Sequence, residues 1–119
     1  MNTEEAREAW CLALESREYA QTKAMLQGGK GYCCLGVACL VAEQNGIAVE
    51  REKYTGANRL VGSSLHRQEA VLLWLGLQDG AGAFEGEAGV SLVTLNDSQG
   101  MTFAEIAAVI RSNPRGLFL

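Results

Sequence analysis

The chain has 119 residues, which predicts one globular domain (residues 1–119) with enough length to bury a core without metal ions or disulfides. A hydrophobic content of 48% is typical of a folded globular protein rather than a disordered one. The formal net charge of -4 argues against a basic surface for phosphates, so we expect no direct nucleic-acid partner.

The chain shows no sign of a secretory signal or a membrane span. It opens with the acidic stretch MNTEEAREAW, which lacks the basic start and apolar centre of a signal peptide. Its longest apolar run, residues 32–42, is far shorter than the roughly 20 residues that a membrane helix needs. We therefore expect a cytoplasmic protein without a membrane partner, in which the four cysteines stay reduced.

A first helix is predicted at the N-terminus. Asn2 or Thr3 can cap it, and Glu4 and Glu5 suit the positive end of its dipole. Residues 16–26 are ambiguous between a short strand and an extended arm, and the glycines that follow break the chain. The apolar face of the first helix is formed at helical spacing by Ala6, Trp10, Ala13 and Leu14.

A second, central helix is predicted over residues 33–44. It is apolar on nearly every side, so we expect it to be buried. Asn45 and Gly46 indicate its end, because Gly46 is free to adopt a left-handed conformation. Its many small residues (Cys, Ala and Gly) would let neighbours such as Trp10 and Trp74 pack close.

The middle of the chain predicts a short β element and a third helix. Residues 47–51 alternate in polarity and favour an edge strand paired with residues 57–61. Ser63 or Ser64 can cap a helix over residues 65–75.

Glycine-rich residues 80–89 predict a mobile surface loop with Phe84 at its tip. A short apolar segment follows over residues 90–95, and residues 96–100 (NDSQG) are typical of a turn.

The last helix has the strongest local signals. Thr102 and Glu105 form a capping-box pattern, and Asn113 with Pro114 indicates the end of the helix. The apolar tail, residues 117–119, is expected to pack on the body or on a second subunit. Together the elements predict a helix-dominated α+β domain, with about four helices around the Cys/Ala/Gly-rich central helix and a small antiparallel β element.

The cysteine spacing argues against a metal site. Structural zinc needs about four converging ligands, and the chain has no Cys-x-x-Cys pair. Cys34 and Cys39 are five residues apart, about 140° around a helix, so they diverge. Only Cys11 and His66 remain as ligands of the same kind, and we expect no metal and no other cofactor.

The adjacent pair Cys33 and Cys34 leaves a catalytic alternative open. A disulfide between them would be strained, because disulfide geometry needs side chains that face each other. Their position at a helix N-terminus is expected to lower a thiol pKa, with His66 as a possible base. The favoured interpretation is that they are buried small apolar residues.

Several motifs together resemble a group of small proteins from bacteriophages and prophages. They are YCCLGVAC at residues 32–39, WLGL at residues 74–77, LND at residues 95–97 and TFAEIA at residues 102–107. The resemblance covers most of the chain and implies a phage or mobile-element origin and a small cytosolic product. It implies no particular activity.

The first hypothesis for function is a non-enzymatic accessory protein of phage type that binds a host protein or complex. A homodimer is a possible form of this protein. By analogy it would inhibit a host defence system, as an anti-CRISPR protein does. An acidic surface would suit a basic channel on the target. The candidate contacts are Phe84, Glu85 and Glu87 on the loop and Glu4, Glu5 and Glu8 on the first helix.

Two alternatives belong to other classes of protein. A small-molecule binder, for example of a nucleotide messenger, would place a pocket near Tyr19, Gln21, Asn96 and Asp97. A cysteine-dependent enzyme would use Cys33 or Cys34.

Overall fold

The computed structural model describes residues 2–53, 56–86 and 89–119. In these ranges the chain forms five α-helices, one short 3₁₀ helix and a single two-stranded antiparallel hairpin, which confirms the helix-dominated α+β class. The elements in chain order are α1 (Thr3–Glu15), β1 (Gln27–Gly28), β2 (Gly31–Tyr32), α2 (Cys34–Gln44), η1 (Leu65–Arg67), α3 (Glu69–Leu75), α4 (Leu92–Asp97) and α5 (Phe103–Arg111).

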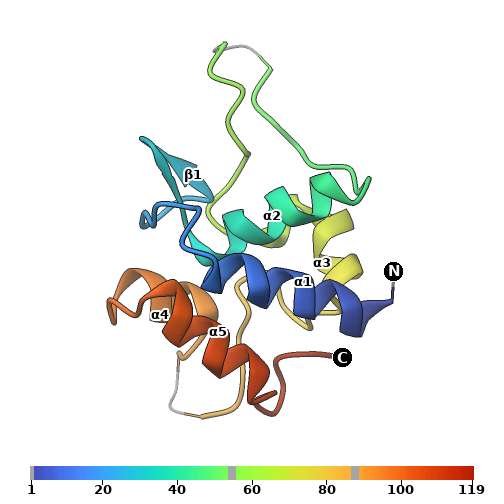
Figure 1. Cartoon of the computed structure of the whole chain (residues 1–119), viewed down its shortest axis with the longest axis vertical. Helices are drawn as coiled ribbons and strands as arrows, with labels where there is room; N and C mark the ends of the chain where they lie inside the picture. Colours follow the sequence, from blue (N-terminus) through green and yellow to red (C-terminus); the bar gives the residue numbers. More distant parts are fainter. Residues whose placement is uncertain (1, 54–55, 87–88) are drawn as a thin grey trace.

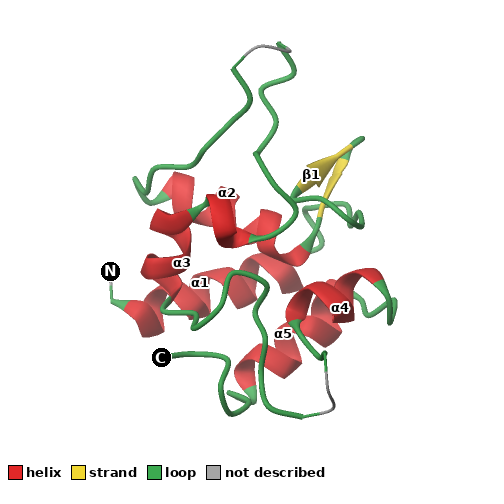
Figure 2. Ribbon diagram, turned by 180° about the vertical axis from the view of Figure 1, so that it is seen from behind, coloured by secondary structure: helices red, strands yellow, loops and turns green. Residues whose placement is uncertain are grey.

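The predicted central helix is confirmed as α2. Helices α1, α3 and α4 all pack against it, and α5 packs along α1 on the other side (Figure 1). Figure 2 shows from behind that the helices form the body, while the hairpin lies at its edge. Gly46 has a φ of 81° directly after this helix, as the Asn-Gly signal predicts. The buried residues of α2 are Cys34, Leu35, Gly36, Val37, Ala38, Cys39, Val41 and Ala42.

Helix α1 begins where its capping signals predict. The Asn2 side chain accepts from the Glu5 amide at 2.9 Å, and Glu5 accepts from the Asn2 amide at 3.3 Å. Trp10 is fully buried, and its indole Nε1 donates to the Cys34 carbonyl at 2.9 Å. This bond joins α1 to the first turn of α2, so the tryptophan contributes a polar anchor as well as apolar area.

The ordered hairpin lies earlier in the chain than predicted. Gln27 pairs with Tyr32 and Gly28 with Gly31, so the glycines that were expected only to break the chain form a tight turn instead. Gly31 lies so close to residue 20 that an added Cβ would be 2.9 Å from its carbonyl oxygen. The expected pairing of residues 47–51 with residues 57–61 is reduced to one antiparallel bridge, Arg51 to Leu60.

Two further differences concern helix boundaries. The predicted third helix is divided at Gln68, which leaves helical geometry (φ -123°, ψ 57°) because its side chain bonds to the backbone of Glu50 and Val61. Residues 92–97 form α4, although the turn-forming residues Asn96 and Asp97 predict a turn at its C-terminal part. Ser91 and Thr94 cap this helix reciprocally, so a local start signal outweighs the turn-forming residues at its end.

The apolar tail packs mainly on the body of the same chain. Leu117 is fully buried, and Phe118 pairs with Leu77 through an isolated antiparallel bridge. Leu119 alone projects, with 84% of its surface exposed. The last helix, α5, is confirmed with its Thr102–Glu105 capping box.

Gly36 generates a stability prediction. A Cβ at this position would overlap the backbone carbonyl of Leu26, which cannot move because Leu26 is fully buried. We expect Gly36→Ala to lower the free energy of unfolding by about 3 kcal/mol or more in urea titrations. Helix propensity alone predicts the opposite sign, a gain of about 1 kcal/mol.

Gly86→Ala is the matched control, because a Cβ there meets nothing within 4 Å. Its free energy of unfolding should change by less than about 1 kcal/mol. Equal effects of the two variants would contradict the close approach of α2 to residue 26.

Candidate interaction surface

All four cysteines carry free, buried thiols. Burial raises the pKa of the Cys11 and Cys33 thiols to about 11 and the pKa of Cys39 to about 12. It also raises the pKa of the Cys34 thiol. Because the thiolate is the reactive form of cysteine, these side chains behave as small apolar core residues.

The expectation of a lowered thiol pKa at the start of the central helix is wrong. Cys33 is the N-cap of α2, and the backbone amides of Leu35 and Gly36 do act to lower its pKa. The loss of hydration is larger and sets the direction. His66, the proposed base, lies exposed on the surface with its Nδ1 2.5 Å from the Ser64 hydroxyl, whereas the thiols are enclosed.

Asn96 organises the polar cluster that the sequence suggests as a ligand pocket. It is only 1% exposed, and its Oδ1 accepts from the Cys34 amide at 3.2 Å and from the Gln21 side chain at 2.9 Å. Its Nδ2 donates to the Thr22 carbonyl and to the Asp97 carboxylate, each at 2.8 Å. The amide is therefore fully used in joining protein segments.

Three of the predicted pocket residues, Gln21, Asn96 and Asp97, converge and are joined to one another through Asn96. Tyr19 is half-buried with its ring edge-on to Tyr32, at 6.1 Å between centroids. Gln21 donates a second bond, to the Met101 carbonyl at 2.8 Å. Gln21 lines two open cavities: one with Lys23 has a volume of about 200 Å³, below the ~300 Å³ where small-molecule pockets usually begin, and one with Tyr19 has a volume of about 340 Å³. Neither of these two cavities is lined by all four predicted residues.

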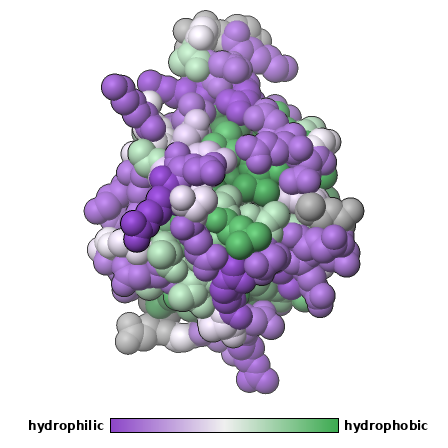
Figure 3. Space-filling model, viewed as in Figure 1, coloured by the Kyte–Doolittle hydropathy of each residue, from purple (hydrophilic) through white to green (hydrophobic). Residues whose placement is uncertain are grey.

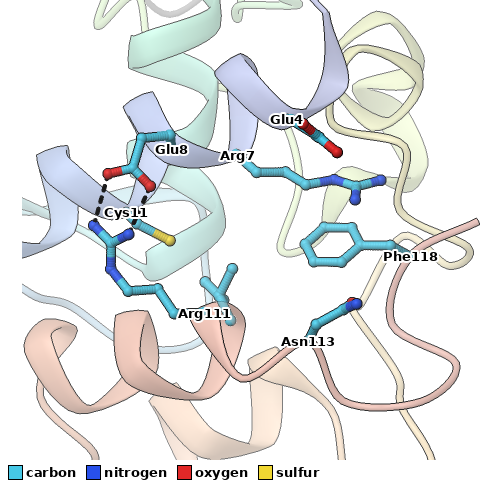
Figure 4. A pocket seen from close by; sticks show the side chains of 8 residues that line it. Glu4, Arg7, Glu8, Cys11, Arg111, Asn113 and Phe118 are labelled. Carbon is cyan, nitrogen blue, oxygen red and sulfur yellow. Dashed lines mark hydrogen bonds and ion pairs between the residues drawn. The ribbon is translucent and has the colours of Figure 1, made fainter.

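A second polar cluster fastens α5 to α1 (Figure 4). Arg111 donates to both oxygens of Glu8, at 2.6 and 3.1 Å, and to both oxygens of Glu15, at 3.0 and 2.8 Å. These bonds lower the pKa of the Glu15 carboxyl. The Arg111 guanidinium thus binds two carboxylates that lie seven residues apart on the surface of α1.

A cavity of about 300 Å³ lies beside this cluster, between α1, α5 and the C-terminal tail. Its other arginine, Arg7, donates from Nε to the Leu75 carbonyl at 2.9 Å and lies 3.7 Å above the Phe118 ring (Figure 4). Both arginines of the cavity are therefore engaged by the chain's own groups, one of them in a cation–π contact.

The glycine-rich loop folds back instead of presenting Phe84 at a tip. The Asp79 carboxylate accepts from the amides of residues 81 and 83, at 2.8 and 3.3 Å, and Phe84 is half-buried against the core. Glu85 is exposed, with its carboxylate 3.8 Å from the Arg115 guanidinium. Glu87 lies outside the described residues.

The acidic face of α1 is exposed and includes an apolar residue that the sequence interpretation missed. Glu4, Glu5 and Glu8 all face solvent, although Glu5 serves the N-cap and Glu8 binds Arg111. Leu12 is 56% exposed. It lies off the buried stripe, four residues after Glu8, so helical periodicity could have placed it on the acidic face.

Apolar residues are also exposed near the centre of one face of the molecule. On the face shown in Figure 3, hydrophobic residues gather near the middle, where Figure 1 shows α1 and α2, and hydrophilic residues surround them. Ala9 and Ala13 of α1 and Leu40 of α2 are partly exposed in addition to Leu12. We call Leu12 with its flanking glutamates Glu5, Glu8 and Glu15 the α1 face.

Within residues 2–53, 56–86 and 89–119, no group of three or more His, Cys, Asp or Glu side chains is placed to hold a metal ion. The helices in the same ranges include none with the length and apolar character to cross a membrane.

The fold and these sites define a small helix-dominated α+β protein whose polar side chains largely bind one another. The chain belongs to the family described as domain of unknown function DUF8296, whose model matches residues 1–114. No curated protein and no solved structure matches the chain.

The Asn96 cluster generates a prediction for stability. Asn96→Ala leaves the buried Cys34 amide without its acceptor, so we expect the free energy of unfolding to fall by about 3 kcal/mol. Asn45→Ala is the control, because Asn45 is exposed and makes one side-chain bond, to the Val41 carbonyl. The free energy of unfolding of Asn45→Ala should fall by about 1 kcal/mol or less. Equal decreases for the two variants in denaturant titrations would rule out the proposed role of Asn96.

The enclosed thiols generate a prediction for reactivity. At pH 8 a raised pKa leaves a smaller thiolate fraction than in a free cysteine, and burial also blocks access. We expect a maleimide to label the native protein slowly and all four cysteines rapidly in denaturant, as followed by mass spectrometry. A native Cys33 or Cys34 that is alkylated rapidly with an apparent pKa below 8 would instead support the cysteine-enzyme alternative.

Proposed function

We propose that the protein is a non-enzymatic binding protein that acts through the α1 face. The observation that carries the proposal is Leu12, which is 56% exposed between glutamates on a helix whose other large apolar residues are buried. Such an apolar centre with a charged surround is typical of a protein–protein contact. The enclosed thiols and mutually bonded polar side chains favour this function over catalysis.

The charges of the α1 face indicate the chemistry of its partner. Glu5, Glu8 and Glu15 surround Leu12, and Arg111 compensates one of the three charges. The proposed partner is therefore a protein with an apolar seat for Leu12 and a rim of lysine or arginine. Long-range attraction between such surfaces speeds their encounter and weakens with added salt.

The biological setting is proposed from the resemblance to phage proteins. A phage-derived accessory protein in the bacterial cytoplasm would use this acidic face to bind a host protein, and an anti-defence role would follow if the target were a nucleic-acid-binding effector. The net charge of -4 supports competition for a basic channel. In this proposal Glu4, together with Glu85 and Glu87 of the loop, contributes secondary charge.

Capture from a bacterial lysate tests the α1 face. We expect tagged wild-type protein to enrich a basic partner in quantitative mass spectrometry, and Leu12→Lys to reduce that enrichment at least tenfold. Leu119→Lys is the matched control because Leu119 is even more exposed but lies on the tail, so this variant should bind like the wild type. Raising the salt concentration should weaken wild-type binding.

Two further arms make the capture experiment decisive. Glu5→Lys should weaken binding to the same partner, whereas Glu85→Lys should weaken it less because Glu85 is not part of the α1 face and its carboxylate lies 3.8 Å from the Arg115 guanidinium. Retention of the partner by both Leu12→Lys and Glu5→Lys would contradict the α1 face as the binding surface.

A further inference from the structure

A second exposed leucine lies on a different element. Leu73 of α3 is 63% exposed and borders an open groove of about 680 Å³. The groove runs between α3, η1 and the segment around residues 48–50. Ala48 and Ala70 line it with short side chains, among the polar residues Glu50, His66, Arg67, Gln68 and Glu69. We propose that this face binds a second copy of the chain, with each Leu73 entering the groove of the other copy.

The face carries both halves of a self-complementary contact. A two-fold symmetric interface requires one surface patch to fit a copy of itself. Here the projecting side chain, Leu73, and the recess beside it belong to the same face, so one rotation can seat both leucines at once. The recess is far larger than a leucine side chain and is lined by exposed residues apart from Gln68.

Gln68 at the base of the groove does not require a polar partner from outside. It is 1% exposed, its Oε1 accepts from the Glu50 amide at 2.8 Å, and its Nε2 donates to the Glu50 and Val61 carbonyls at 2.9 and 3.0 Å. An apolar side chain can therefore cover it without leaving an unpaired buried group.

The charges on the two exposed leucine faces distinguish their occupants. One cation, Arg67, and two carboxylates, Glu50 and Glu69, line the groove, so a two-fold axis can place Arg67 of one copy against Glu69 of the other. The α1 face carries three glutamates around Leu12, of which Arg111 compensates one charge, so two such faces carry more uncompensated negative charge and would repel each other. Charge complementarity therefore favours the groove beside Leu73 as the surface that binds a second copy, and it leaves the α1 face for a basic partner.

The size of the groove sets the expected affinity. A standard interface buries about 800 Å² on each partner. Helix α3 has only seven residues, so the contact must extend over η1 and the 48–50 segment to approach that area. A dimer with a dissociation constant in the range of about 1 to 100 µM is expected.

Sedimentation equilibrium of the full chain from 1 to 300 µM tests the inference. The wild-type mass should rise from 12.8 kDa toward twice that value. Leu73→Lys should stay monomeric throughout, while Leu12→Lys and Leu119→Lys should dimerise as the wild type does. Because Leu73 is exposed, circular dichroism and the melting temperature should show that the variant remains folded.

A charge exchange makes the test independent of Leu73. Arg67→Glu and Glu69→Arg should each weaken the dimer at least fivefold, and the double variant R67E/E69R should recover most of the affinity, because the pair is restored across the axis. A wild-type mass that stays at 12.8 kDa at 300 µM would overturn the inference, as would unimpaired dimerisation of Leu73→Lys.

The outcome is separable from that of the proposed function. If the wild type is monomeric and Leu73→Lys loses a captured partner, the groove binds another protein and the second copy is ruled out. If Leu73→Lys is monomeric but still captures the partner, the wild-type dimer is supported and is not required for partner binding. If Leu12→Lys loses the partner but still dimerises, both the proposed function and the proposed dimer are supported.

Discussion

The start of helix α2 is the point on which the rest of the structure depends. A helix begins with backbone amides that lack intrahelical partners, and here the side chain of the N-cap residue, Cys33, makes no capping hydrogen bond. Asn96 supplies the missing acceptor from another part of the chain, at the Cys34 amide. Trp10 binds the Cys34 carbonyl, and Leu26 accepts from the Cys33 amide at 3.2 Å. Three other segments of the chain therefore meet around one buried helical turn.

This convergence gives a physical meaning to the cysteine-rich motif. The first turn of α2 must be narrow, because α1, the hairpin and α4 all approach it closely. Cysteine and glycine supply small volume, and Gly36 in particular leaves space for the backbone of residue 26. The motif of adjacent cysteines is thus explained by packing and needs no thiol chemistry.

Local signals predicted the helix ends well, since a cap or a glycine stop acts over three or four residues. Asn2, Thr102 and Gly46 mark element boundaries for this reason. The errors concern residues whose roles depend on distant partners. Gln68 interrupts a helix because of Glu50 and Val61, and no periodicity in its own neighbourhood contains that information. For the candidate site, the sequence identifies glutamates on α1, and helical periodicity also places Leu12 among them. The degree to which Leu12 stays exposed depends on how α2 and α5 pack against α1, which periodicity alone does not give.

The contact between Arg111 and two glutamates has a mechanical consequence. Glu8 and Glu15 are seven residues apart, about 10.5 Å along the helix axis. Because the Arg111 guanidinium binds both carboxylates, it fixes the position of α5 along the axis of α1. A shift of α5 by a single turn would break the bonds to one carboxylate. The same contact immobilises two of the three glutamates beside Leu12 before any partner arrives. A partner therefore binds glutamate side chains that are already ordered. Their conformational entropy is lost during folding, so it adds less to the cost of binding.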